Sequence, residues 1–90
     1  MNRIPTHPGE ILKDELEARN MSMNRLAKEL NVPAGRISQI MSGKRAITPD
    51  TAIRLANYLG TSAEVWMNLQ TQYDLALARR KLEDELKIAS

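Results

Sequence analysis

Helix-start signals recur along this chain at short intervals, and they limit what it can fold into. Such a start typically shows a capping side chain followed by a proline or an acid. Behind each start, apolar residues recur at the three- and four-residue spacing of a helix face, and no β-rich run is present. The starts lie at His7-Pro8, Ser22, Pro33, Thr48-Pro49 and Ser62. The sequence therefore predicts an all-α fold of four or five helices.

Composition limits the chemistry. The 90 residues suffice for one modest core, so we expect a single domain over residues 1–90. The absence of cysteine excludes disulfides and thiolate metal sites. His7 is the only histidine, and we interpret it as a helix cap or surface residue, since no second ligand of its kind exists. With no paired nucleophile and base, we predict no enzymatic activity, no cofactor and no metal.

Hydrophobicity along the chain bears on where the protein works. No apolar run approaches the roughly 20 residues that span a bilayer. The segment MNRIPTHPGE at the start has no apolar stretch of the signal-peptide kind. We therefore expect a cytoplasmic protein that makes no membrane contact.

Two short helices in the middle of the chain suggest a function. The first is predicted over 22–30, Asn31-Val32 connects, and the second is predicted over 33–42. In a DNA-binding helix-turn-helix the first helix braces the second, which enters the major groove. Residues 20–60 also carry six Lys or Arg and only two acids, which suits a polyanion. The pattern predicts a helix-turn-helix over 22–45 that binds double-stranded DNA.

The outward side of the second helix carries no acid and no bulky apolar side chain. Gln39 can form a paired hydrogen bond with adenine, and Arg36 can do the same with guanine or reach a phosphate. Lys44 and Arg45 follow at the end of this helix and can anchor phosphates, although they could equally complement the helix dipole. The predicted DNA-binding residues are Ser22, Asn24, Ala34, Gly35, Arg36, Ser38, Gln39, Ser42, Lys44 and Arg45.

Smaller contributions are expected from the remaining candidates. Ala34 could touch a thymine methyl, and Gly35 leaves room for close approach of the backbone to DNA. Ser22 is above all a cap, and its hydroxyl could also meet a phosphate, as could Asn24 in the exposed first turn.

The last predicted helix runs from about 63 to 89. Its first part is expected to pack on the core through Val65, Trp66, Leu69 and Tyr73. Its second part continues an apolar stripe through Leu75, Ala78, Leu82, Leu86 and Ala89. A stripe with no core left to cover requires a partner. We expect a homodimer through this helix, although the same stripe could serve another protein.

Several stretches resemble known families. The segment SMNRLAKELNVPAGRISQIMSGKR at 22–45 resembles the Cro/repressor-like (XRE) helix-turn-helix. The segments HPGEIL at 7–12, GKRAITPDTAIRLA at 43–56 and LGTSAEVWMNLQTQYDL at 59–75 resemble the HigA (virulence-associated protein I) antitoxin family. The resemblance implies a five-helix, lambda-repressor-like homodimer that binds a palindromic operator in its own promoter. It also implies neutralisation of a HigB-type toxin, an mRNA endonuclease of the RelE-like class.

The chain departs from the wider repressor pattern at two places. Met23 lies where related repressors often carry a polar residue, and Pro33-Ala34-Gly35 offers few hydrogen-bonding side chains. Discrimination between sequences would then lean on Arg36, Ser38 and Gln39, and on DNA shape. Two other readings stay open: a stand-alone XRE-type regulator without a toxin, and an interaction module that does not bind DNA.

Overall fold

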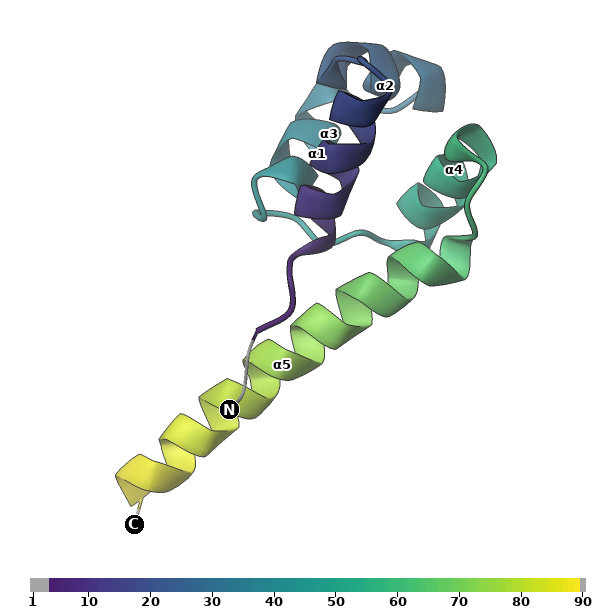
Figure 1. The fold of residues 1–90 in the computed structure, drawn as a ribbon. Coiled ribbons are helices and arrows are strands. Elements are labelled where there is room, and N and C mark those ends of the chain that lie inside the picture. The colour runs from purple at the N-terminus through teal and green to yellow at the C-terminus, as the bar shows by residue number, and fades with distance from the viewer. Residues whose placement is uncertain (1–3, 90) are drawn as a thin grey trace.

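The computed structural model describes residues 4–89, and side chains as far as residue 87. The five helices are α1 (Pro8–Ala18), α2 (Met23–Leu30), α3 (Ala34–Met41), α4 (Pro49–Leu59) and α5 (Ala63–Ala89). The four short helices gather on one end of α5, which then runs on beyond them (Figure 1). Between residues 4 and 89 there is no strand, and the prediction of an all-α fold with an extended last helix is confirmed.

The helices begin where capping side chains are available. His7, Ser22, Thr48 and Ser62 each accept a backbone N–H from the first turn of the helix that follows. Pro33 differs, because it has an extended backbone and occupies the cap position without a side-chain hydrogen bond. The third helix therefore starts one residue later than predicted.

The core lies where α1 to α4 meet the first part of α5. Trp66 is only 3% exposed, and its indole N–H donates to the Thr61 hydroxyl at 2.9 Å. Val65 is 49% exposed, so its prediction as a core residue was wrong. Neighbours on a helix point about 100° apart, and α5 docks with Trp66 inward. The buried apolar side chains that form the core cluster are Leu12, Leu16, Leu26, Ala27, Leu30, Ile37, Ile40, Ile47, Ala52, Leu55, Leu59 and Trp66.

The start of α1 crosses the end of α3 at very close range. A Cβ atom built on Gly9 would lie 1.9 Å from the carbonyl oxygen of Ile40. No side chain can occupy that space, so glycine lets the two backbones touch. This contact sets where α3 ends relative to the N-terminal helix.

A buried amide joins the loop after α3 to α5. Gln70 is 4% exposed, and its Oε1 accepts the backbone N–H of Ile47 at 2.8 Å. Its Nε2 donates to the Asp74 carboxylate at 2.9 Å. Because both polar ends of the amide are satisfied, burial costs little and the loop is held in place. Sequence reasoning did not single out Gln70.

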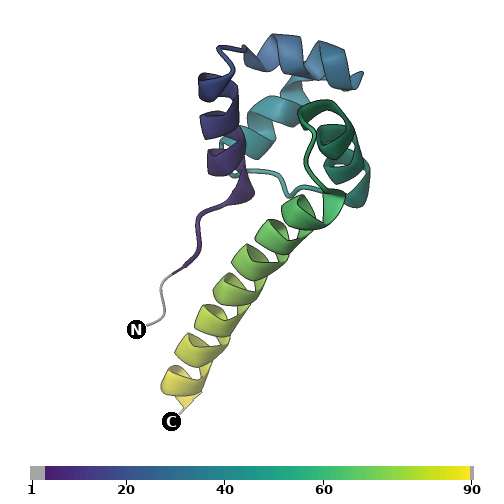
Figure 2. The same ribbon diagram turned by 45° about the vertical axis from the view of Figure 1, so that its right-hand side comes forward.

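Beyond Asp74, α5 leaves the other helices (Figure 2). Leu75, Leu82 and Leu86 are 45%, 56% and 61% exposed. The Cα extents of 51 × 22 × 22 Å reflect this projection. The side chain of Ala89, placed in the predicted stripe, lies outside the described residues. In the described part of the chain, no helix is both long and apolar enough to cross a membrane.

Candidate nucleic-acid interface

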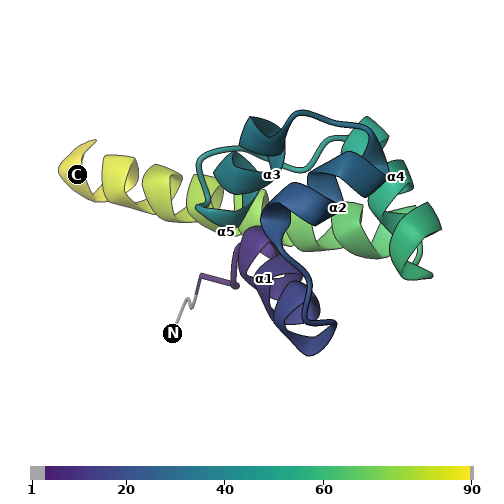
Figure 3. The same ribbon diagram turned by 90° about the horizontal axis from the view of Figure 1, so that it is seen from above.

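A tight turn joins α2 to α3 and sets the angle between them. Asn31 adopts a left-handed backbone with φ of 57°, and the N–H of Val32 donates to the Ala27 carbonyl at 3.0 Å. Asparagine tolerates this conformation better than most residues. The turn places α2 against α3, and no other helix lies over the two in the view from above (Figure 3).

The outer side of α3 is polar and uncovered. Ala34, Gly35, Ser38, Gln39 and Ser42 are all exposed. A Cβ atom on Gly35 would meet nothing within 4 Å, so the fold itself does not demand glycine there. The Ser42 hydroxyl donates to the Gln39 backbone carbonyl at 3.1 Å, and the Gln39 side-chain amide forms no hydrogen bond with another described residue. The structure thus presents these candidates together on one ridge.

Two hollows flank this ridge. One, which we name the methionine groove, has a volume of about 640 Å³ and lies between the second half of α1, the start of α2 and the end of α3. It is lined by Lys13, Leu16, Glu17, Met21, Ser22, Met23, Ser38, Met41 and Ser42. Ser22, Ser38 and Ser42 therefore line the same groove. Met23 is 41% exposed here and does not join the core.

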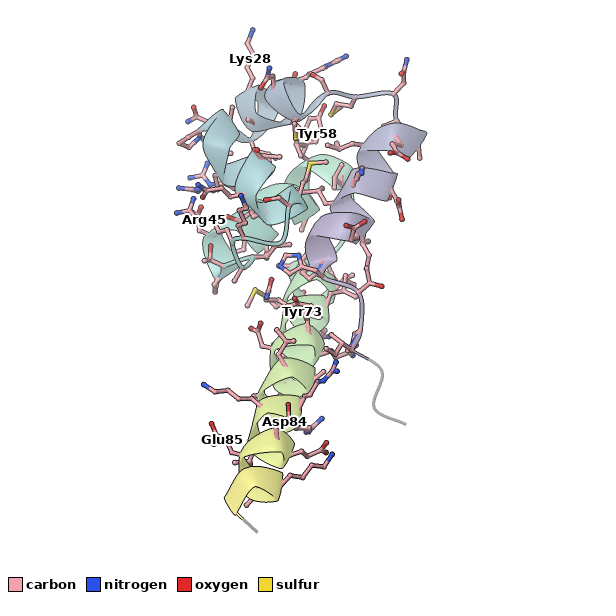
Figure 4. The ribbon with its side chains drawn as sticks, turned by 90° about the vertical axis from the view of Figure 1, so that its left-hand side faces the viewer. Lys28, Arg45, Tyr58, Tyr73, Asp84 and Glu85 are labelled. Atoms are coloured by element: carbon pink, nitrogen blue, oxygen red, sulfur yellow. The ribbon has the colours of Figure 1, made fainter. Side chains whose placement is uncertain are left out.

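The other hollow, which we name the arginine hollow, encloses about 380 Å³ between α3 and α4. It is lined by Asn31, Val32, Arg36, Arg45, Ala46, Thr48, Asp50, Thr51 and Arg54. Nitrogen-rich side chains gather around Arg45 on this flank (Figure 4). Three guanidinium groups thus share a small hollow with a single carboxylate, which is an environment that suits an anion.

Arg36 is not free in the arginine hollow. Its Nη1 donates to Asp50 Oδ2 at 3.3 Å, and its side chain is 31% exposed. The same carboxylate oxygen accepts from Arg54 Nε at 2.9 Å, while Arg54 Nη1 donates to the Leu30 carbonyl at 2.9 Å. Asp50 and Arg54 were missed because nothing in the sequence says which residues of α4 face α3. Their four-residue spacing, typical of helical ion pairs, was the available signal.

Lys44 and Arg45 lie on the turn that follows α3, and both are exposed. The turn is possible because Gly43 adopts a φ of 78°, a left-handed conformation that favours glycine. Asn24 is exposed in the first turn of α2, and the Ser22 hydroxyl accepts the N–H of Arg25 at 3.1 Å. Cations and N–H groups therefore surround the α3 ridge on several sides, which is what binding to a phosphate backbone requires.

Comparisons with known proteins agree with this geometry. A helix-turn-helix family model matches residues 12–66. Virulence-associated protein I of Dichelobacter nodosus is 47% identical over 81 residues, which is 88% of this chain and 75% of that protein. Among solved structures, an addiction module antidote protein of the HigA family from Coxiella burnetii is 45% identical. It has a TM-score of 0.87, and the match covers 98% of this chain and 97% of that one.

A third relative was solved with DNA. The Pseudomonas aeruginosa antitoxin HigA with the higBA promoter is 44% identical, with a TM-score of 0.87 and coverage of 91% of this chain and 90% of that one. The family model, the relatives and the fold all point the same way. This chain therefore belongs to the Cro/repressor-like (XRE) helix-turn-helix proteins, in the family of virulence-associated protein I and the HigA antitoxins.

Proposed function

We propose that this protein is an antitoxin of a HigBA-like toxin–antitoxin system, which represses its own operon by binding the operator and neutralises a toxin that cleaves mRNA. The observation that carries the proposal is the relative solved with promoter DNA at 44% identity, together with the open polar ridge of α3. The role is one of binding, so no catalysis is proposed. Because the proposed partner is promoter DNA, we expect the protein to be in the cytoplasm.

In this proposal α3 lies in the major groove. Gln39 and Arg36 contact base edges, and Ala34, Gly35 and Ser38 lie against the groove floor or wall. The phosphate contacts come from Ser22, Asn24, Ser42, Lys44 and Arg45. Support comes from their exposure around one ridge, and from the cations at the end of α3, where phosphates would pass.

The exposed stripe on α5 is proposed to join two copies. Leu75, Leu82 and Leu86 form an exposed apolar stripe on the part of α5 that extends beyond the other helices, and such a stripe favours burial against a partner. A twofold dimer would present two α3 helices to a palindromic operator, with half-sites about 34 Å apart. The whole chain would then act as one DNA-binding domain, with a dimerisation helix over about 63–89. Toxin binding on the same stripe is the competing use.

A binding titration tests the DNA proposal. Fluorescence anisotropy would compare the duplex upstream of the chain's own gene with a scrambled duplex of equal composition. We expect a clear preference for the natural duplex, and Gln39→Ala should reduce it while Gln72→Ala, on an exposed position of α5, should not. Equal affinity for both duplexes would contradict specific binding.

The phosphate contacts have a separate signature. Replacing Lys44 and Arg45 by Glu should weaken binding to both duplexes alike and flatten its dependence on salt, because fewer counterions are released. If salt dependence stays as in the parent chain, these two cations serve only the helix dipole.

The toxin partner requires its own experiment. A small basic open reading frame next to this gene would be co-expressed with a tagged copy of the chain. We expect co-purification of the two products and restored growth when the antitoxin is supplied. An isolated gene, or a neighbour that neither binds nor inhibits growth, would favour a stand-alone XRE-type regulator.

A further inference from the structure

We infer that Asp50 is a positioning residue for DNA selectivity: its carboxylate holds the Arg36 guanidinium in the orientation that reads a base. The inference rests on the proposed function, because it assigns Arg36 to a base contact. Asp50 itself lies on α4, outside the helix-turn-helix, and is not proposed to touch a base. It would act on the DNA only through Arg36.

The first step of the argument is geometric. Asp50 Oδ2 accepts from Arg54 Nε at 2.9 Å, and Arg54 Nη1 donates to the Leu30 carbonyl at the end of α2. Arg54 thus links the Asp50 carboxylate to the end of α2, separately from the contact with Arg36. Arg36 Nη1 reaches the same oxygen at 3.3 Å. The chain of contacts therefore runs from α2 through α4 to the ridge of α3.

The second step concerns what remains available on Arg36. A guanidinium has five N–H donors in a planar fork, and Asp50 engages one nitrogen. The side chain is 31% exposed, so it is partly withdrawn from water but not sealed. An arginine held on one edge loses fewer rotamers when its other edge meets guanine, which makes a specific contact cheaper to form.

The third step concerns charge. The Asp50 side chain is 58% exposed and sits among the cations of the arginine hollow. A carboxylate there repels any phosphate backbone, whatever the sequence, so it lowers affinity for random DNA. Asp50 would therefore act in two opposite directions, weakening general binding while favouring the correct site. Selectivity is a difference of affinities, so the sequence-independent repulsion leaves it unchanged and only the positioning of Arg36 raises it.

The chain contains a second unit of the same construction, which provides a control. Arg19 Nε donates to Glu15 Oε1 at 3.0 Å, and Arg19 Nη2 donates to the Leu59 carbonyl at 3.0 Å. This unit also joins an acid, an arginine four residues away and the end of a helix. It does not include a residue of α3. Glu15→Gln therefore removes the same charge from the same kind of ion pair, without touching Arg36.

The experiment uses the full chain and two duplexes. One is selected by the protein from a random-sequence pool, and the other is its scrambled counterpart. For Asp50→Asn, we expect affinity for the scrambled duplex to rise by about two- to fivefold at low salt, and the preference for the selected duplex to fall by about fivefold or more. Glu15→Gln should leave both within about twofold. Asp50→Ser serves as a second carboxylate-free variant if Asp50→Asn does not fold.

The Arg36→Ala background distinguishes positioning from other roles. There, Asp50→Asn should no longer change the preference, although it should still raise affinity for the scrambled duplex. If the preference falls equally in that background, or if Asp50→Asn raises both affinities together, the inference is overturned and DNA binding stands. If the parent chain selects no sequence from the pool, the proposed function itself fails and takes the inference with it.

Discussion

The two ends of α5 share one helix but lie in different surroundings. The first part of α5 belongs to the packed region of the molecule, residues 4–74, which we call the head. Trp66 and Gln70 are buried there. In the tail, residues 75–89, the leucines at 82 and 86 are more than half exposed. Packing maintains the helix in the head. In the tail, helix formation rests on local preference, because residues 75–89 are rich in Ala, Leu, Lys, Arg and Glu and contain neither Gly nor Pro.

This difference has a consequence for energetics. A change in the head should alter the free energy of unfolding, since it disturbs a close-packed core. A change in the tail should leave that free energy almost untouched and should appear in association instead. The four variants below test this separation, beginning with the one expected to destabilise the head most.

Gly9→Ala should be the most damaging. The added methyl group would lie 1.9 Å from the Ile40 carbonyl oxygen, so α1 and α3 must move apart. We expect a loss of about 3 kcal/mol or more in the free energy of unfolding, measured by urea denaturation followed through Trp66 fluorescence. Gly35→Ala is the matched control, because its methyl group meets nothing. It should be neutral or stabilising by up to about 1 kcal/mol, and equal losses in the two variants would contradict the close contact.

Gln70→Ala should come next. It leaves the buried N–H of Ile47 without its acceptor, and such an orphaned group costs about 1–3 kcal/mol. Gln72→Ala changes the same residue type on the same helix at an exposed position, and it should shift stability by no more than about 0.5 kcal/mol. Thermal unfolding by circular dichroism compares the two. Identical melting curves would mean that Gln70 does not hold the loop.

His7 should give a smaller effect that depends on pH. Burial lowers its pKa from the ordinary value of 6.5, although the carboxylates of Asp74 and Glu10 oppose the shift. Its Nδ1 accepts the N–H of Gly9 and must be unprotonated to do so. The unfolded chain therefore takes up the proton first, so this contribution is present above pH 6.5 and is lost as pH falls through the lower folded pKa.

Replacing His7 by Asn, which can also cap a helix, should remove this part of the pH dependence. Melting temperatures of the parent chain and of His7→Asn would be compared from neutral pH down to mildly acid pH. The difference in melting temperature between the parent chain and His7→Asn should narrow or reverse as the pH falls. A constant gap would show that the imidazole does not titrate in this window.

Substitutions in the tail should change the free energy of unfolding least and dimerisation most. Leu82→Lys combined with Leu86→Lys should change the unfolding free energy by under about 0.5 kcal/mol, measured where the parent chain is monomeric. At micromolar concentration, light scattering should show the parent as a dimer and this variant as a monomer. Asp84→Lys adds the same charge and lies about 200° around the helix from Leu82, so it should keep the dimer. A parent chain that is monomeric throughout would contradict the proposed pairing.

The sequence predicted the fold well where the cause is local. Caps such as Ser22 and Thr48, and the left-handed Gly43, act on their own neighbours and can be read from a short window. Val65 and Trp66 show the limit, because both fit a helical stripe and only the docking angle of α5 decides which one is buried.

The candidate interface follows the same division. The ridge of α3 could be predicted because its residues share one helix and one periodicity. The arginine hollow could not, since Asp50 and Arg54 reach Arg36 and Leu30 across 14 and 24 positions of sequence. The division of the ridge residues between base contacts and phosphate contacts is a prediction.

Because α5 is continuous, it fixes two quantities at once, a distance and an angle. From Ala63 to Ala89 the helix is uninterrupted, so the tail stripe stands at a set angle and distance from the reading ridge. Each residue inserted between Trp66 and Leu82 would turn the stripe by about 100° and move it about 1.5 Å. An insertion of seven would nearly restore the angle while lengthening the arm by about 10 Å. If two copies pair through the tail, the length of this helix determines the spacing between the operator half-sites.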